Sequence, residues 1–246
     1  LDPAKRPVIC SCVPRNIVGL FKLSSLALDL PCLTVEGMTS LLTTCPQLRY
    51  FCIRYSDHSI ISNAIWKQED WDRFMAKGTT TAQVLQSLKV VSKTLETLRI
   101  DVDLMTSQAG RNYLDDEGLI KDFSDFPGLK ALTVDVDMIR DFPNSVKDLP
   151  NVEILIFTGV VLLPSSKLRR SGQQVSSGAF PNLHTVGITC YDEHVDHSCK
   201  GWRRLRRRWG HLRNQLAASD VKVISPYPLS IIIPGTLELA IAKELR

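Results

Sequence analysis

Hydrophobic residues recur along the chain in a six-residue phrase whose first, fourth and sixth positions are apolar. The six copies run over Leu23–Leu28, Leu48–Ile53, Leu95–Ile100, Leu129–Val134, Val152–Phe157 and Leu183–Ile188. The last two apolar positions alternate with mostly polar or small ones, which is typical of a strand that buries one face. The pattern therefore predicts short strands near residues 26–28, 51–53, 98–100, 132–134, 155–157 and 186–188.

Helical patterns lie between the phrases. Residues 37–44 and 82–91 place apolar side chains at helical spacing, and Thr81 is the candidate N-cap of the second helix. A last unit is expected from a helix over Trp202–Ala218 and a strand near 221–224. A unit of one helix and one strand cannot bury its apolar side alone, so neighbouring units must stack. We predict an α/β solenoid with a parallel sheet on its concave side and helices on its convex side.

The spacing of the copies predicts an irregular leucine-rich repeat. Two of the five intervals fall in the usual range of about 20–29 residues, and three are longer. The longest interval holds an insertion at about residues 56–80, which is either an extra helix around Asn63–Met75 or one degenerate repeat. The stretches Asp103–Phe123 and Leu163–Phe180 are loop-like in composition. We interpret residues 1–246 as a single irregular leucine-rich-repeat domain.

Four copies share an apolar residue and a proline just before them, and proline cannot continue a helix. These lead-ins are Cys45-Pro46-Gln47-Leu48, Phe126-Pro127-Gly128-Leu129, Leu149-Pro150-Asn151-Val152 and Phe180-Pro181-Asn182-Leu183. They resemble the irregular repeats of leucine-rich-repeat F-box proteins, and Ser92–Ile100 is similar to repeats of fungal members. The resemblance implies a horseshoe-shaped solenoid that captures substrates for a cullin-type ubiquitin ligase. The F-box itself is not seen in this chain, so contact with a ligase adaptor is expected through a region outside it.

The concave sheet is the expected partner-binding surface. In a solenoid of this kind, the residues that flank the buried strand positions point outward from the sheet. The candidate residues for binding a protein partner are Tyr50, Arg54, Arg99, Asp101, Thr133, Asp135, Ile154, Ile156 and Thr185. The two isoleucines form an apolar spot in an otherwise polar groove. The alternative is that insertions cover part of this surface.

Two clusters contain residue types that bind metals. Asp101 and Asp103 should lie beside Asp135 and Asp137 on the next strand, where they could hold a hard cation or a basic segment, or could be solvated strand ends. The loop Cys190–Cys199 contains two cysteines and two histidines, which are zinc ligand types. Their spacing matches no recurrent zinc module, and a polar loop after a strand is the favoured interpretation. We predict no metal site and no cofactor.

A basic patch stands out near the C-terminus. At helical spacing Leu205, Trp209, Leu212 and Leu216 share one face, and arginines occupy the rest of the helix. The patch consists of Arg203, Arg204, Arg206, Arg207 and Arg213. It could bind phosphates or an acidic partner, or it could be the solvated outer face of the last unit. The chain's formal net charge of +4 is too small to indicate nucleic acid by itself.

The remaining sequence features favour an intracellular binding protein over an enzyme. No nucleophile elbow, P-loop, dinucleotide-binding or metalloprotease motif occurs. No signal peptide and no apolar run of about 20 residues is seen, so no membrane contact is expected. The seven scattered cysteines favour a reducing setting, cytoplasmic or nuclear. We predict a protein–protein recognition module, the substrate-binding region of an F-box-type ubiquitin-ligase subunit. The alternative is an adaptor that binds nucleic acid or another polyanion through helix 202–216, although nucleic acid is the less expected partner.

Overall fold

Seven strands form the framework of the computed structural model. The structure describes residues 22–29, 34–56, 80–103, 120–135, 138–139, 146, 149–158, 165–176, 178, 180–188, 207, 210–217 and 219–224. The strands are β1 (Ser25–Asp29), β2 (Tyr50–Ser56), β3 (Thr97–Asp103), β4 (Ala131–Asp135), β5 (Ile154–Thr158), β6 (Thr185–Ile188) and β7 (Lys222–Ile224). Each lies where the apolar phrase, or the last expected unit, predicted a strand.

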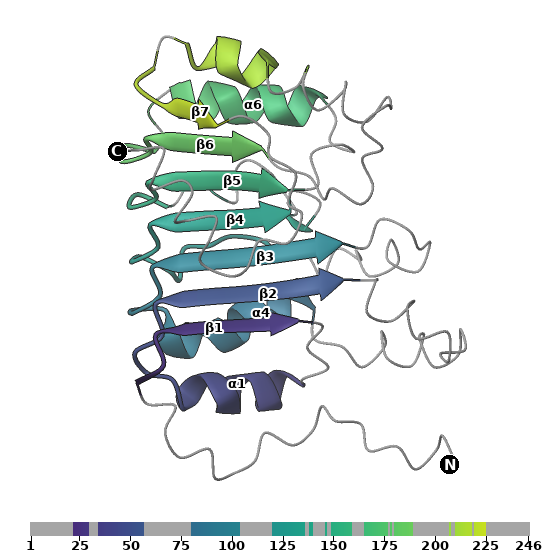
Figure 1. The fold of residues 1–246 in the computed structure, drawn as a ribbon, viewed down its shortest axis with the longest axis vertical. Coiled ribbons are helices and arrows are strands. Elements are labelled where there is room, and N and C mark those ends of the chain that lie inside the picture. Colours follow the sequence, from purple (N-terminus) through teal and green to yellow (C-terminus); the bar gives the residue numbers. More distant parts are fainter. Residues whose placement is uncertain are drawn as a thin grey trace, which may run out of the picture.

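The strands pair in one open sheet in the order β1-β2-β3-β4-β5-β6-β7, and every pairing is parallel. Consecutive strands are therefore neighbours, as Figure 1 shows, and the strand starts line up along one edge of the sheet. This confirms the predicted parallel sheet and makes the fold a leucine-rich-repeat-like solenoid.

Equivalent apolar positions of the phrase stack across the sheet. The fourth positions are in register from strand to strand and form the row Leu26, Phe51, Leu98, Leu132, Leu155, Val186 and Val223. The sixth positions form a second row of Leu28, Ile53, Ile100, Val134 and Phe157. Both rows belong to one hydrophobic core. Because each unit buries its apolar residues against the next, the sheet fixes the spacing of the described units.

Two helices complete the core in the N-terminal half. Helix α1 (Val35–Thr43) and helix α4 (Thr81–Leu88) lie side by side, and a 3-10 turn, η3 (Lys89–Val91), follows α4. Their buried residues, which include Met38 and Leu88, join the same core as the strand residues. The Thr39 hydroxyl also donates a hydrogen bond of 3.1 Å to Ser87 Oγ, which ties the two helices together.

The N-cap of α4 is Thr80, so the prediction of Thr81 was one residue late. The Thr80 side chain accepts a hydrogen bond from the backbone N–H of Gln83, and the Gln83 side chain accepts one from the N–H of Thr80. This reciprocal pair satisfies two of the donors that a helix start leaves unpaired. Thr81 is instead a buried residue of the first turn.

The loop predicted over Leu163–Phe180 contains a helix, α6 (Ser165–Ser176). Its serines and glycine suggested a flexible connection, but packing against the rest of the protein stabilises a helix there. Val175 joins the hydrophobic core, and Gly172 lies against Gln215 of the helical segment at residues 210–215. Tertiary contacts of this kind outweigh a weak helix propensity.

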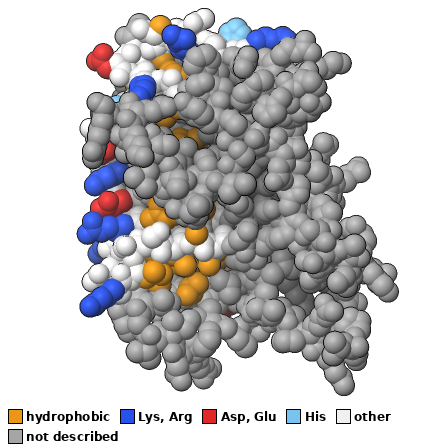
Figure 2. Space-filling model, in the orientation of Figure 1, with side chains coloured by type: hydrophobic (Ala, Val, Ile, Leu, Met, Phe, Trp, Pro, Cys, Tyr) orange, Lys and Arg blue, Asp and Glu red, His pale blue; other side chains and the backbone are white. Residues whose placement is uncertain are grey.

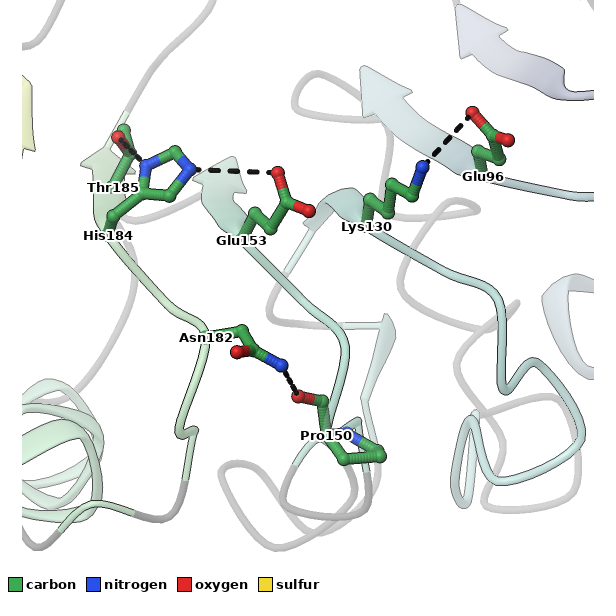
Figure 3. A network of polar contacts seen from close by, with 7 residues as sticks. All are labelled: Glu96, Lys130, Pro150, Glu153, Asn182, His184 and Thr185. Carbon is green, nitrogen blue, oxygen red and sulfur yellow. Dashed lines mark hydrogen bonds and ion pairs between the residues drawn. The ribbon is translucent and has the colours of Figure 1, made fainter.

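Two asparagines link the turns that precede the strands. The Asn151 side chain donates a 2.7 Å hydrogen bond to the carbonyl oxygen of Pro127, and the Asn182 side chain donates a 2.8 Å bond to that of Pro150. Figure 3 shows the second of these bonds. Each asparagine follows a lead-in proline and bonds to the lead-in of the preceding unit. The turns are therefore stacked in the same order as the strands.

Gly128 occupies the equivalent position of the unit before, where this bond is missing. A Cβ atom there would lie 3.6 Å from the carbonyl oxygen of Lys93, without a positive φ to oppose the substitution. Gly128→Asn should therefore add a third bond and stabilise the fold by about 0.5–1.5 kcal/mol beyond Gly128→Ala. The alanine variant is the matched control, because it contributes only the loss of unfolded-state freedom, about 0.4–1 kcal/mol. Equal unfolding midpoints for the two variants in urea would contradict the added bond.

Candidate functional site

The sheet face opposite the core carries the strand row that was expected to meet a partner. One row of register partners crosses six strands on this outer sheet face. It consists of Ala27, Cys52, Arg99, Thr133, Ile156 and Gly187. Cys52, Arg99, Thr133 and Ile156 are buried, as are Asp135, Thr158 and Thr185 on the same face. The middle of the row is therefore not an open groove in this structure. Its role in partner binding stays a prediction.

The other residues of the predicted row differ in exposure. Tyr50 and Ile154 are half-buried, and the side chains of Arg54 and Asp101 lie outside the described part of the structure. Ile156 lies over Gly187, where an added Cβ would be 3.4 Å from its Cγ1 atom. The expected apolar spot is therefore packed against the neighbouring strand at Ile156 and partly accessible at Ile154.

A positive and a negative side chain are buried together on the outer sheet face. Arg99 pairs in register with Thr133, and Asp135 lies two residues further along the same strand, on the same face. Both side chains are at least nine-tenths buried, and both residues have interaction partners. Charged groups are removed from water in this way only where opposite charge or hydrogen bonds compensate them. The two residues therefore belong to the buried framework of the sheet.

An exposed row of charges follows the edge where the strands begin. The residues just before β2 to β6 are Arg49, Glu96, Lys130, Glu153 and His184, and we call this row the charge ladder. In each adjacent pair the carbonyl oxygen of one accepts the backbone N–H of the next. The side chains are consequently held at the strand spacing of about 4.8 Å. Figure 2 shows blue and red side chains following one another along this edge.

Neighbouring charges of the ladder interact through their side chains. Glu96 lies between Arg49 and Lys130, with nitrogen–oxygen distances of 3.9 and 3.7 Å. His184 Nε2 lies 3.7 Å from Glu153 Oε2, and its Nδ1 is 3.0 Å from the hydroxyl of Thr185, as Figure 3 shows. These side chains are substantially exposed, so each contact contributes little to stability. The charge ladder is therefore a patterned surface that adds little to the stability of the fold.

The sequence contains a signal for the charge ladder. The second position of the six-residue phrase is charged or ionisable in five consecutive copies, and its sign alternates from Arg49 to Glu153. The alternation of the phrase predicts the flanking strand positions, one step later, as the partner-facing ones. The residue one step earlier, just before each strand, keeps its side chain substantially exposed.

Placing a lysine at position 96 would put three cations in a row. Glu96→Lys should lower the free energy of unfolding by about 1 kcal/mol at low salt, since two weak attractions are lost and repulsion replaces them. The loss should shrink strongly between about 0.01 M and about 1 M salt, where the Debye length falls from about 30 to about 3 Å. Glu96→Gln, which removes the attraction alone, is the control. Urea unfolding at both salt concentrations measures the effect, and a loss independent of salt would contradict it.

The basic patch is partly described. Arg207 and Arg213 are exposed, and Leu212 and Leu216 are buried in the core. Residues 210–216 therefore turn Leu212 and Leu216 inward and Arg213 outward, as their spacing predicted. Arg203, Arg204 and Arg206 lie outside the described residues. Binding of a polyanion at this patch stays a prediction.

The described residues include neither a candidate metal site nor a candidate membrane-spanning helix. No group of three or more His, Cys, Asp or Glu side chains in that part of the chain is placed to hold a metal ion. The Cys190–Cys199 loop and Asp137 lie outside it. No helix in the described ranges combines the length and the apolar character that a bilayer crossing requires.

The open parallel sheet, with consecutive strands adjacent and the core on one face, defines the class of the protein as a leucine-rich-repeat-like α/β solenoid. Comparison with protein-family models, curated protein sequences and solved structures gives no match. The class is therefore assigned from the strand order and register alone.

Proposed function

We propose that the chain is a protein–protein recognition module, the substrate-binding part of an F-box-type ubiquitin-ligase subunit. The observation that supports recognition is the seven-stranded sheet itself, which presents one set of side chains per unit at a fixed spacing. Regular surfaces of this kind serve repeat proteins as extended binding sites. The four lead-in prolines, which resemble those of F-box proteins with leucine-rich repeats, support the ligase role.

The surfaces available for this role are those that the described structure leaves exposed. The charge ladder is one of them, because its side chains reach solvent while the middle of the outer sheet face is buried. Electrostatic patterns of this kind contribute more to the choice of partner and to the association rate than to raw affinity. The ladder would therefore select a partner, and other contacts would supply the binding energy.

Affinity purification of the full-length protein from its own cells tests the ligase role. A ligase subunit should recover a cullin and its adaptor, together with proteins whose recovery rises when the proteasome is inhibited. The matched control is the protein with Leu132→Ala, which should lose the substrates by disrupting the solenoid while it retains adaptor and cullin. Recovery of neither adaptor nor cullin with the wild-type protein would overturn the ligase role.

A further inference from the structure

The charges of this chain are strongly segregated. Helix α6 and residues 197–218 together contain ten of the 30 lysines and arginines and none of the 26 acidic residues. The remainder of the chain therefore has 20 basic against 26 acidic residues, a formal charge of −6. The formal net charge of +4 is the sum of +10 in these segments and −6 in the remainder. One part of the molecule is strongly basic, and the rest is acidic.

The fold brings α6 into contact with the described part of the second basic segment. Helix α6 lies beside the helical segment at residues 210–215, next to the β6–β7 end of the sheet, as Figure 1 shows. At the crossing, a Cβ added to Gly172 would lie 3.3 Å from Gln215 Cβ, and the Gln215 amide is 3.5 Å from the carbonyl oxygen of Arg169. The absence of a side chain at Gly172 lets the helices approach closely.

Both helices turn basic side chains to solvent. The exposed residues are Arg169 and Arg170 on α6 and Arg207, His211 and Arg213 near or on the other helix, and we call this set the terminal basic surface. Figure 2 shows blue and pale-blue side chains gathered at this end of the molecule. None of Arg169, Arg170 and Arg207 forms an ion pair with another residue of the described part. The helix at 165–176 was not part of the basic patch that the sequence indicated.

We propose that the terminal basic surface binds a short acidic segment of a partner protein, about five or six residues long. Helix α6 has 12 residues and is therefore about 18 Å long, the span of five or six extended residues. Four of the five residues of this surface are arginines, whose planar guanidinium groups hold carboxylates through paired hydrogen bonds. The inference deepens the proposed recognition function by naming a surface and its partner chemistry.

A short acidic segment fits this surface better than duplex nucleic acid does. A duplex is stiff over about 500 Å, so it cannot bend to concentrate its phosphates on a surface about 18 Å long. A flexible peptide can place all of its carboxylates over the arginines. The charge division of the chain therefore favours a compact anionic ligand.

Fluorescence anisotropy with the purified chain tests the proposal. The probe is a labelled peptide of six glutamates flanked by Gly-Ser, and the matched probe has glutamines in their place. We expect binding of the glutamate peptide alone, weakened by salt. Arg169→Glu with Arg170→Glu, and separately Arg207→Glu with Arg213→Glu, should each weaken binding at least tenfold. The control pair Lys22→Glu with Lys93→Glu makes the same change of charge elsewhere and should change affinity less than threefold.

Several results would overturn the proposal. If the α6 pair binds like the wild type, the two helices do not act together. If a 12-base-pair duplex binds as tightly as the peptide, the surface is a general polyanion site. Should a charge-reversed pair unfold, the corresponding glutamine variants, checked by thermal unfolding, should still weaken binding severalfold. Adaptor and cullin take no part in this assay, so peptide binding without ligase association would overturn the ligase role alone.

Discussion

Leu132→Ala is expected to destabilise the protein by about 2–5 kcal/mol. Leu132 is fully buried in β4, where it lies in register between Leu98 and Leu155. Truncation would leave a cavity in the middle of the row that stacks across the sheet. Because neighbouring units are held by nearest-neighbour contacts, the damage would reach both adjoining strands. Urea unfolding followed by circular dichroism measures the loss.

Two further variants serve as controls for Leu132→Ala. Leu132→Met keeps the volume and should cost less than about 1.5 kcal/mol. Lys130→Ala removes an exposed side chain from the same strand start and should change stability by no more than about 0.5 kcal/mol. If Leu132→Ala costs no more than the methionine variant, the row would not be the continuous core that the register indicates.

The sheet could be predicted from the sequence because its cause is local and repeated. Leu98 and Leu132 stand at the same position of the same phrase, and stacking copies of one phrase in order allows only a parallel sheet of neighbours. Periodicity also identified the inward face of the last helix at Leu212 and Leu216. In each case the decisive property is which residues are apolar, and the chain shows that directly.

The surfaces could not be predicted in the same way. Period-two alternation states that Arg99 and Leu98 point to opposite faces, but not whether the second face meets solvent. Polar residues such as Thr133 and Asp135 suggested an open groove, and the structure buries them. The contact of α6 with Gln215 depends on packing between segments far apart in sequence, which no local pattern contains.

Because the middle of the outer sheet face is buried, the candidate recognition surfaces lie elsewhere on the molecule. A partner cannot reach Arg99 or Ile156 in the structure as it stands, because both side chains are buried. Glu96 and Lys130 at the strand starts, and Arg170 on α6, are accessible. The proposed recognition role therefore rests on the edge of the sheet and on its C-terminal end more than on the middle of its outer face.

Arg99→Glu distinguishes a buried outer sheet face from an open one. Arg99 is 1% exposed and lies on the same face as the buried Asp135. A glutamate there would bury two like charges without compensation, so we expect a loss of about 3–5 kcal/mol in the free energy of unfolding at neutral pH. Thermal and urea unfolding of the purified variant measure this loss.

Arg49→Glu is the matched control for this substitution, because it makes the same change at an exposed position of the charge ladder. The Arg49 side chain is 68% exposed, and its contact with Glu96 is 3.9 Å. In solvent such a reversal should cost no more than about 1 kcal/mol. A loss for Arg99→Glu as small as that of the control would mean that solvent reaches the middle of the row. In that case the residues of the outer sheet face, and not the sheet edge, would again be the first candidates for partner binding.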